Sequence, residues 1–232
     1  MAKAKKKAPA VEPEVSLMTA CHAGELAAVR ALFDRGVDPS IKDPETTITP
    51  LSVAAGAGHA KIVALLLERG ADPCPFDGAT LVVALLRGHF EIAELLVKKG
   101  ASVHHGAGGR TAITHVMCYG EPPLEVIDWL LAHGALPEPD RRGNFPLHQA
   151  AKEGWSELVS RFLDAGADLE LGPTIDLGLG APGVDTPLGA AKYYQHKKVV
   201  ALLEQASAAR RPKKPATRAK KAPRKATLDA RS

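Results

Sequence analysis

The residue types that could carry out catalysis form no recognisable active-site pattern in this 232-residue chain. Gly178–Gly183 has the spacing of a G-x-G-x-x-G dinucleotide fingerprint, but no alternation of strands and helices surrounds it, and Pro182 lacks an amide donor for a phosphate. The sequence contains no nucleophile elbow, zinc-peptidase motif or Walker motif. We therefore expect no enzymatic activity and no cofactor. The alternative, an enzyme with an unrecognised site, requires a pocket with converging polar groups.

Residues that could bind a metal are also sparse. His104 and His105 are adjacent, but a metal site needs further ligands, so two solvated loop histidines are the favoured interpretation and we expect no metal. Cys21, Cys74 and Cys118 are far apart and form no C-x-x-C pair. This pattern favours free thiols in a reducing compartment over a disulfide framework or a zinc site.

The charge of the chain is distributed unevenly between its centre and its ends. Residues 1–14 carry a net charge of +2, residues 15–209 a net charge of −7, and residues 210–232 a net charge of +9. We expect an acidic folded body between two disordered basic segments. The basic run Lys3–Lys7 leads into no apolar segment, and no stretch of 18 apolar residues occurs. These features predict a cytoplasmic protein without a secretion signal or a membrane partner.

The basic segment 210–232 is a candidate for binding polyanions. Ten positive charges with no aromatic residue among them could bind phosphates of DNA or RNA by counterion release, without reading sequence. Its composition resembles the Lys-Ala-Pro tails of linker histones. The alternative is a solubilising tail, or one that folds back on the acidic body. The candidate residues are Arg210, Arg211, Lys213, Lys214, Arg218, Lys220, Lys221, Arg224 and Lys225.

Glycines recur along the acidic body in two series of nearly constant period. The first series has spacings of 34, 30, 32 and 34 residues and is continued by Gln195. The second series follows each member of the first after 12 residues, except in the fourth copy, where the gap is 14, and is continued by Ser207. The first series is Gly24, Gly58, Gly88, Gly120 and Gly154, and the second is Gly36, Gly70, Gly100, Gly134 and Gly166. Such a period predicts a stack of repeats.

Each copy contains signals for two short helices. Between the two glycines lies an apolar pattern, such as Ile62–Leu67, that is typical of a helix with a broad buried face. Nine residues before the first glycine stands a Thr-Pro-Leu type of segment, such as Thr49–Leu51 or Thr186–Leu188, in which Thr is a helix N-cap and Pro occupies the first helical position. The glycine after this first helix supplies a left-handed stop.

The segment Thr49–His59, followed by Ile62-Val63 and Arg69–Asp72, resembles an ankyrin repeat, as does Asp140–His148. The first and third copies depart from the Thr-Pro-Leu-His pattern, yet both glycine series persist through them. The resemblance implies an all-α ankyrin-repeat solenoid of six helix-turn-helix repeats over residues 15–209, with a long loop at 171–185 before the last. It also implies a protein-protein interaction module that binds a protein partner through its concave face.

In repeats of this kind the partner contacts come from the loop tips and from two variable residues just before the first glycine. All three tyrosines fall at the variable positions, and Tyr and Arg often supply much of the binding energy at interfaces. The alternative is that two of the tyrosines only cover the end of the last repeat. The candidate contact residues are Phe76, Asp77, Arg87, Tyr119, Arg141, Arg142, Asn144, Lys152, Tyr193 and Tyr194.

We therefore expect a monomeric adaptor whose basic tail tethers it to a polyanion. The rival hypothesis is a nucleic-acid-associated protein that acts mainly through residues 210–232. Salt-sensitive binding that depends on this segment would favour the rival.

Overall fold

A computed structural model describes residues 13–43, 45–46, 48–74, 78–104, 107–172 and 184–210. These residues form twelve α-helices and one short 3-10 helix, with no strand among them, which confirms the predicted all-α solenoid. The helices are α1 (Pro13–Ala23), α2 (Leu26–Asp34), α3 (Pro50–Ala57), α4 (Ala60–Glu68), α5 (Ala79–Leu86), α6 (Phe90–Lys98), η1 (Ala107–Gly109), α7 (Ala112–Met117), α8 (Leu124–Ala132), α9 (Pro146–Glu153), α10 (Ser156–Asp164), α11 (Pro187–Tyr193) and α12 (Lys197–Arg210).

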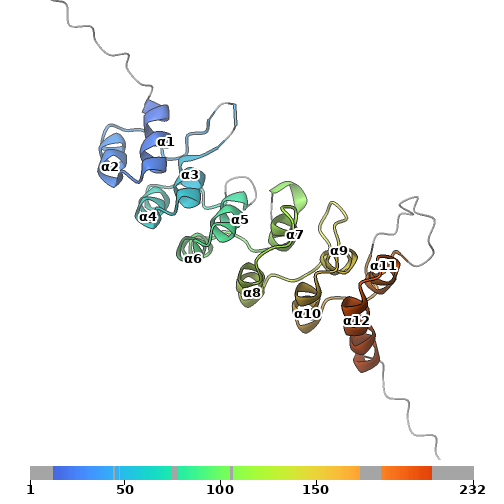
Figure 1. Ribbon diagram of the computed structural model, residues 1–232. Coiled ribbons are helices and arrows are strands. Elements are labelled where there is room, and N and C mark those ends of the chain that lie inside the picture. Colours follow the sequence, from blue (N-terminus) through green and yellow to red (C-terminus); the bar gives the residue numbers. More distant parts are fainter. Residues whose placement is uncertain are drawn as a thin grey trace, which may run out of the picture.

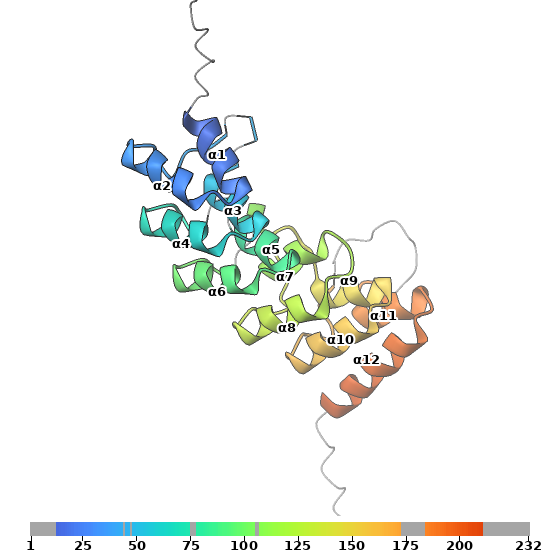
Figure 2. The same ribbon diagram turned by 60° about the vertical axis from the view of Figure 1, so that its left-hand side comes forward.

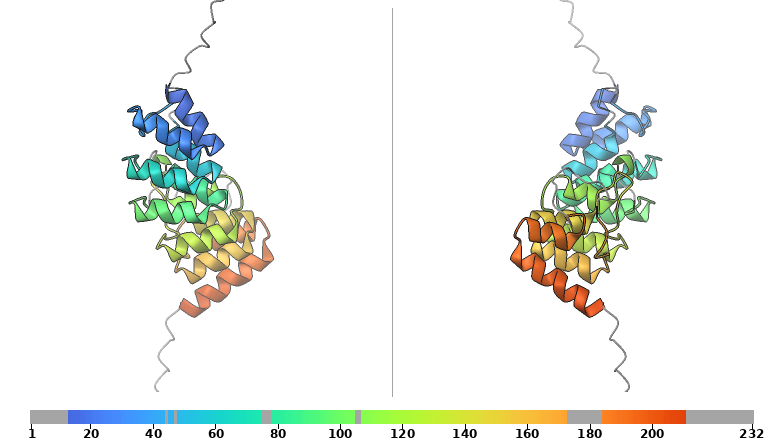
Figure 3. Two further views of the ribbon diagram at one scale, coloured as in Figure 1. Left: turned by 90° about the vertical axis from the view of Figure 1, so that its left-hand side faces the viewer. Right: turned by 90° about the vertical axis from the view of Figure 1, so that its right-hand side faces the viewer.

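The helices form two rows that run the length of the molecule (Figure 1). The odd-numbered helices α1 to α11 make one row and the even-numbered helices α2 to α12 make the other. Each helix packs against its own partner, and every odd helix packs against the next helix of its row. The connecting loops project beyond the odd row (Figure 1). Helices α1 and α12 lie at opposite ends of the stack (Figure 2), and all helices lie across its long axis (Figure 3).

A continuous core lies between the two rows. Corresponding positions of the odd helices place a large apolar side chain in this core, and the even helices supply Ile, Val and Leu. Ala54, Ala84 and Ala150 are completely buried, so the odd helices approach one another closely. The large core residues of the odd helices are Leu17, Leu51, Leu81, Ile113 and Leu147.

The helix starts follow the predicted capping chemistry. The Thr49 hydroxyl accepts a hydrogen bond from the Ser52 amide (3.2 Å), and the Thr186 hydroxyl accepts one from the Gly189 amide (3.1 Å). Thr111 caps α7 in the same way through the Thr114 amide (3.1 Å). Each cap satisfies one of the amides that a helix leaves unpaired at its N-terminus.

The first glycine series positions a histidine of the following repeat. Gly24 has a φ of +77°, and the ring of His59 lies so close that a Cβ at Gly24 would be 2.6 Å from it. His59 Nε2 donates to the His22 carbonyl (3.0 Å), and His196 Nε2 donates to the Lys152 carbonyl (2.9 Å). Histidine therefore links one repeat to the next across a turn that only glycine fits.

The structure moves both ends of the helical body slightly outward. Helix α1 begins at Pro13, and Arg210, which we expected in the disordered tail, is the last residue of α12. Arg210 Nη1 donates to the Ala167 carbonyl (2.7 Å) and Nη2 to the Leu163 carbonyl (3.1 Å). These hydrogen bonds to the C-terminal end of α10 explain why the helix continues to this residue. Residues 211–232 lie outside the described residues.

We expect Gly24→Ala to destabilise the protein more than Gly88→Ala. Both glycines have nearly the same left-handed φ, +77° and +75°, so both variants bear a backbone strain of about 1–2 kcal/mol. Only Gly24 faces a histidine ring, which the new methyl group would displace at a further cost of about 1–2 kcal/mol. Urea unfolding of both variants measures the difference. The extra cost should vanish in a His59→Ala background, and equal destabilisation of the two single variants would contradict the proposed contact.

Candidate partner-binding surface

The loops of the fourth and fifth repeats are joined directly at their tips. The Arg141 amide donates to the Gly109 carbonyl (3.0 Å), and Arg142 Nε donates to the Gly108 carbonyl (2.5 Å). Gly108 and Gly109 adopt left-handed φ values of +66° and +83°, which favour glycine. The sequence placed Arg141 and Arg142 at a loop tip, and the structure adds the glycine loop against which they rest.

A buried carboxylate organises the fifth-repeat tip. Asp140 Oδ1 accepts hydrogen bonds from the amides of Arg142 (2.9 Å) and Asn144 (2.9 Å). Its Oδ2 accepts from Asn144 Nδ2 (2.7 Å) and from the Thr114 hydroxyl of α7 (2.8 Å). Burial opposes the charge of Asp140, but these hydrogen bonds outweigh burial and hold the pKa of the carboxyl below its usual range. Asn144 thus supports the turn, and its contact with a partner stays a prediction.

Tyr119 and His115 lie side by side at the end of α7. Tyr119 is 67% exposed, and its ring stacks on that of His115 with a centroid distance of 6.0 Å. His115 is buried, and burial together with the positive charges of Arg110 and Arg142 lowers its pKa. We call Arg110, His115, Tyr119, Arg141 and Arg142 the tip cluster. Sequence reasoning missed His115, which lies inside the first helix of its repeat, and it missed Arg110, although Arg110 precedes the N-cap of α7 as Asn144 precedes that of α9.

A second group of predicted residues comes together at the end of the stack. The rings of Tyr193 and Tyr194 meet edge to face with centroids 5.0 Å apart, and Lys152 Nζ lies 6.0 Å from the centre of the Tyr194 ring. Tyr193 is 48% exposed and Tyr194 is 36% exposed. Lys152, Tyr193 and Tyr194 therefore form one aromatic and cationic surface over α9 and α11.

Arg87 lies apart from both groups, beside a shallow apolar hollow. The hollow has a volume of about 410 Å³ and is lined by residues of α1, α3 and α5 and by the loop that contains Ile48. The small pair Gly56 and Ala57 leaves this space between His22 and Arg87, all at the variable positions of their repeats. The signal for this hollow in the sequence was a pair of small residues, with larger residues at the same positions of the neighbouring repeats. Phe76 and Asp77 lie outside the described residues.

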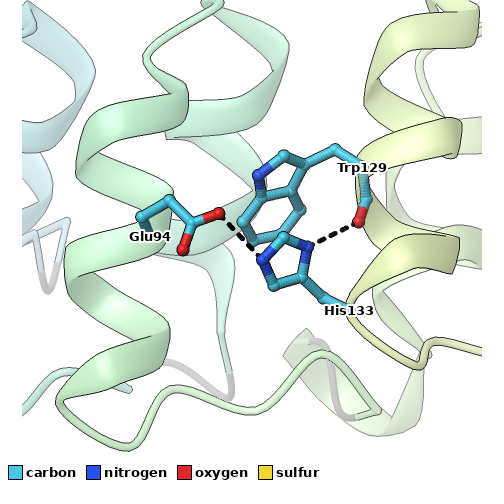
Figure 4. A network of polar contacts seen from close by, with 3 residues as sticks. All are labelled: Glu94, Trp129 and His133. Atoms are coloured by element: carbon cyan, nitrogen blue, oxygen red, sulfur yellow. Dashed lines mark hydrogen bonds and ion pairs between the residues drawn. The ribbon is translucent and has the colours of Figure 1, made fainter.

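The opposite row of helices carries a polar network between the third and fourth repeats (Figure 4). His133 Nε2 lies 2.8 Å from a carboxylate oxygen of Glu94, and His133 Nδ1 lies 2.8 Å from the carbonyl oxygen of Trp129. The Trp129 ring stacks on His133 with centroids 3.7 Å apart. The network joins α6 to α8, and Trp129 also packs against the core.

The described residues contain no group of three His, Cys, Asp or Glu side chains placed to hold a metal ion. Burial raises the pKa of the Cys21 thiol to about 12, so this thiol stays protonated and unreactive. The exposed Cys118 donates its S–H to the Thr114 carbonyl (3.1 Å). No described helix is both long enough and apolar enough to span a bilayer.

Comparison with protein families decides what the stack is. A family model described as ankyrin repeats (3 copies) matches residues 17–107, and one described as ankyrin repeat matches residues 142–172, together more than half of the chain. The chain belongs to the ankyrin repeat family. Residues 108–141 of this ankyrin repeat protein lie between the two matches and include the short α7 and the fourth-repeat insertion before α8.

Two similar proteins place this ankyrin repeat protein among known relatives. SH3 and multiple ankyrin repeat domains protein 2 of Homo sapiens is 30% identical over 146 residues, which are 61% of this chain and only 8% of the human protein. The fold also matches a chain of the solved complex of the predatory endopeptidase Bd0816 from Bdellovibrio bacteriovorus with the immunity protein Bd3460. The TM-score is 0.62 at 25% identity, over 82% of this chain and 97% of that chain.

We expect Asp140→Asn to destabilise the protein at neutral pH, since the amide cannot accept all four hydrogen bonds of the carboxylate. The expected loss is about 1–3 kcal/mol, which corresponds to about 2–4 °C in Tm per kcal/mol. Because the folded pKa of Asp140 is lowered, its stabilisation is present above the unfolded pKa of about 3.9 and is lost as the pH falls through the folded pKa.

Thermal unfolding at pH 7 and pH 3 measures this effect, and the difference between wild type and variant should shrink at pH 3. Asp38→Asn is the control, because Asp38 is exposed and its Oδ1 accepts one hydrogen bond, from the Ser40 amide (2.7 Å). An equal decrease in Tm for Asp140→Asn and Asp38→Asn would contradict the central role of Asp140.

Proposed function

We propose that this ankyrin repeat protein is a non-catalytic interaction module that binds a protein partner through the face formed by the odd-numbered helices and their loops. The observation that carries the proposal is the exposure of Tyr119, Tyr193 and Tyr194 at the C-terminal ends of α7 and α11. Folding normally buries large aromatic side chains, and Tyr is enriched where binding buries it instead.

The rigidity of the stack supports this function. Helix α7 packs between α5 and α9, and α11 packs against α9 and α12, so little conformational entropy is lost when a partner binds. The solved complex named above, in which an endopeptidase is bound to an immunity protein, is consistent with a protein as the partner class. The match to the human relative covers only 8% of that protein's length, so no partner is inferred from it.

We also propose that the basic segment after Arg210 tethers the complex to a polyanion. The segment 211–232 has a net charge of +8, whereas residues 15–209 have a net charge of −7. Phosphate binding by such a segment is driven by counterion release and needs no folded structure.

The interaction function is tested by isolating the partner with full-length protein and measuring its affinity for variants. Tyr119→Ala and Tyr193→Ala should each weaken binding at least tenfold, as expected of residues central to an interface. Leu136→Ala is the matched control, because Leu136 is a 47% exposed apolar residue in the loop after α8 and lies outside both tyrosine groups. Unchanged affinity in both tyrosine variants would refute the proposed surface.

The tethering function is tested by the salt dependence of binding to a 20-base-pair DNA duplex. Replacing Lys220, Lys221, Arg224 and Lys225 with Gln in the full chain should reduce the slope of log K against log salt by about 3 to 4, close to 0.9 for each lost phosphate contact. Fluorescence anisotropy measures this slope. Equal slopes for the two proteins would remove this segment from DNA binding.

A further inference from the structure

We propose that the tip cluster recognises carboxylate side chains in an acidic segment of the protein partner. This inference rests on the proposed function and adds the chemistry of the partner. Arg110, Arg141 and Arg142 would pair with the carboxylates, while Tyr119 and His115 form the adjoining surface.

The first argument is the charge of the two loops. Within the described residues, Arg110, Arg141 and Arg142 form no ion pair, although the body carries 23 acidic residues. By contrast, Arg161 of α10 pairs with Asp128 of α8 at 2.6 Å. Asp140 already accepts four hydrogen bonds, so it leaves the three guanidinium groups for an external acceptor.

The second argument is the set of buried polar atoms that lack a partner. Within the described residues three buried side-chain atoms have no hydrogen-bond partner, and two of them, Arg110 Nε and His115 Nδ1, belong to the tip cluster. A buried polar atom without a partner costs free energy. Burial, together with the positive charges of Arg110 and Arg142, lowers the pKa of His115, and a carboxylate paired with these arginines would offset their charge.

The third argument is that Arg142 and the backbone of Arg141 are held in place before any partner arrives. Arg142 Nε is fixed by the Gly108 carbonyl, and the backbone of Arg141 is fixed by that of Gly109. The planar guanidinium group matches the geometry of a carboxylate, and a fixed group loses less entropy on pairing.

The surroundings favour a short acidic peptide segment over a nucleic acid. Exposed Glu121 follows Tyr119 by two residues, and exposed Glu138 precedes Asp140 by two. These negative charges would repel a continuous phosphate backbone, whereas a peptide can place its carboxylates only where the arginines stand. The tip cluster is thus a local positive site on a negative body.

The test uses full-length protein and NMR, with the acetylated peptide Gly-Glu-Glu-Leu-Glu-Glu-Gly amide as the probe. We expect saturable chemical-shift changes at the amides of Gly108, Gly109 and Tyr119, and an upward shift of the His115 pKa when the peptide is bound. The peptide with Gln in place of every Glu and a single-stranded oligonucleotide of eight thymidines are the comparison probes. These signals come from the tip cluster, so peptide that binds elsewhere on the chain does not contribute to the readout.

Arg110→Gln, Arg141→Gln and Arg142→Gln combined should weaken binding at the tip at least tenfold. Arg30→Gln, Lys61→Gln and Lys98→Gln combined remove the same charge from the even-numbered helices and should leave it unchanged. Thermal unfolding of both triple variants verifies that they fold.

The inference is overturned if the Glu peptide causes no shifts at the tip, if the Gln peptide or the oligonucleotide binds there equally well, or if the two triple variants behave alike. Its failure is separable from that of the proposed function. A partner whose affinity depends on Tyr193 but not on the three arginines would sustain the proposed function and refute this inference.

Discussion

Every helix pair in this protein leaves an apolar face that only the next pair can cover. Leu51 and Ile62 of the second repeat are fully buried because the first and third repeats pack on either side of them. The stack is therefore stable only as a whole, and its rigidity is a consequence of nearest-neighbour packing. At the C-terminal end, α12 packs on α10 and α11, no further described helix covers its outer side, and its buried residues are Val199 and Leu203. The hydrogen bonds of Arg210 to α10 secure the far end of this last helix.

The junctions between repeats are held together in two different ways. At the first, second and fifth junctions a histidine ring lies against the left-handed glycine of the preceding repeat, as His59 does at Gly24. At the third and fourth junctions Glu121 and Trp155 stand in place of that histidine, and nothing lies within 4 Å of a Cβ built on Gly88 or Gly120.

Polar contacts between side chains take over at those two junctions. Glu94 and His133 join α6 to α8 across the third junction. Across the fourth junction, the Thr114 hydroxyl donates to Asp140, and Arg161 pairs with Asp128. The tip cluster lies at this fourth junction, so the candidate site arises where the repeat departs most from its own pattern.

Local signals in the sequence predicted the helices, whereas contacts between residues far apart in the sequence could not be predicted from it. The period of the glycines, the threonine caps and the apolar helices are local signals, and they predicted the helices and their order; even Gln195 was placed correctly, as the one described non-glycine residue with positive φ. The link between Thr114 and Asp140 spans 26 residues and that between Arg210 and Ala167 spans 43. Such contacts depend on side-chain positions that only the packed stack determines. For this reason the contacts of Arg110 and His115 could not be read from the periodic pattern.

The partners proposed for the two basic features of the chain differ in chemistry because the two features carry their charge differently. The segment after Arg210 carries nine Lys and Arg residues within 22 residues, so its proposed attraction for a polyanion depends on charge density and falls with salt. The three arginines of the tip cluster are fewer and belong to a body with a net charge of −7, and the Arg142 guanidinium is held by a hydrogen bond to the Gly108 carbonyl. A rigid site of this kind selects by geometry, since a guanidinium group held in one orientation pairs well only with an acceptor in one place.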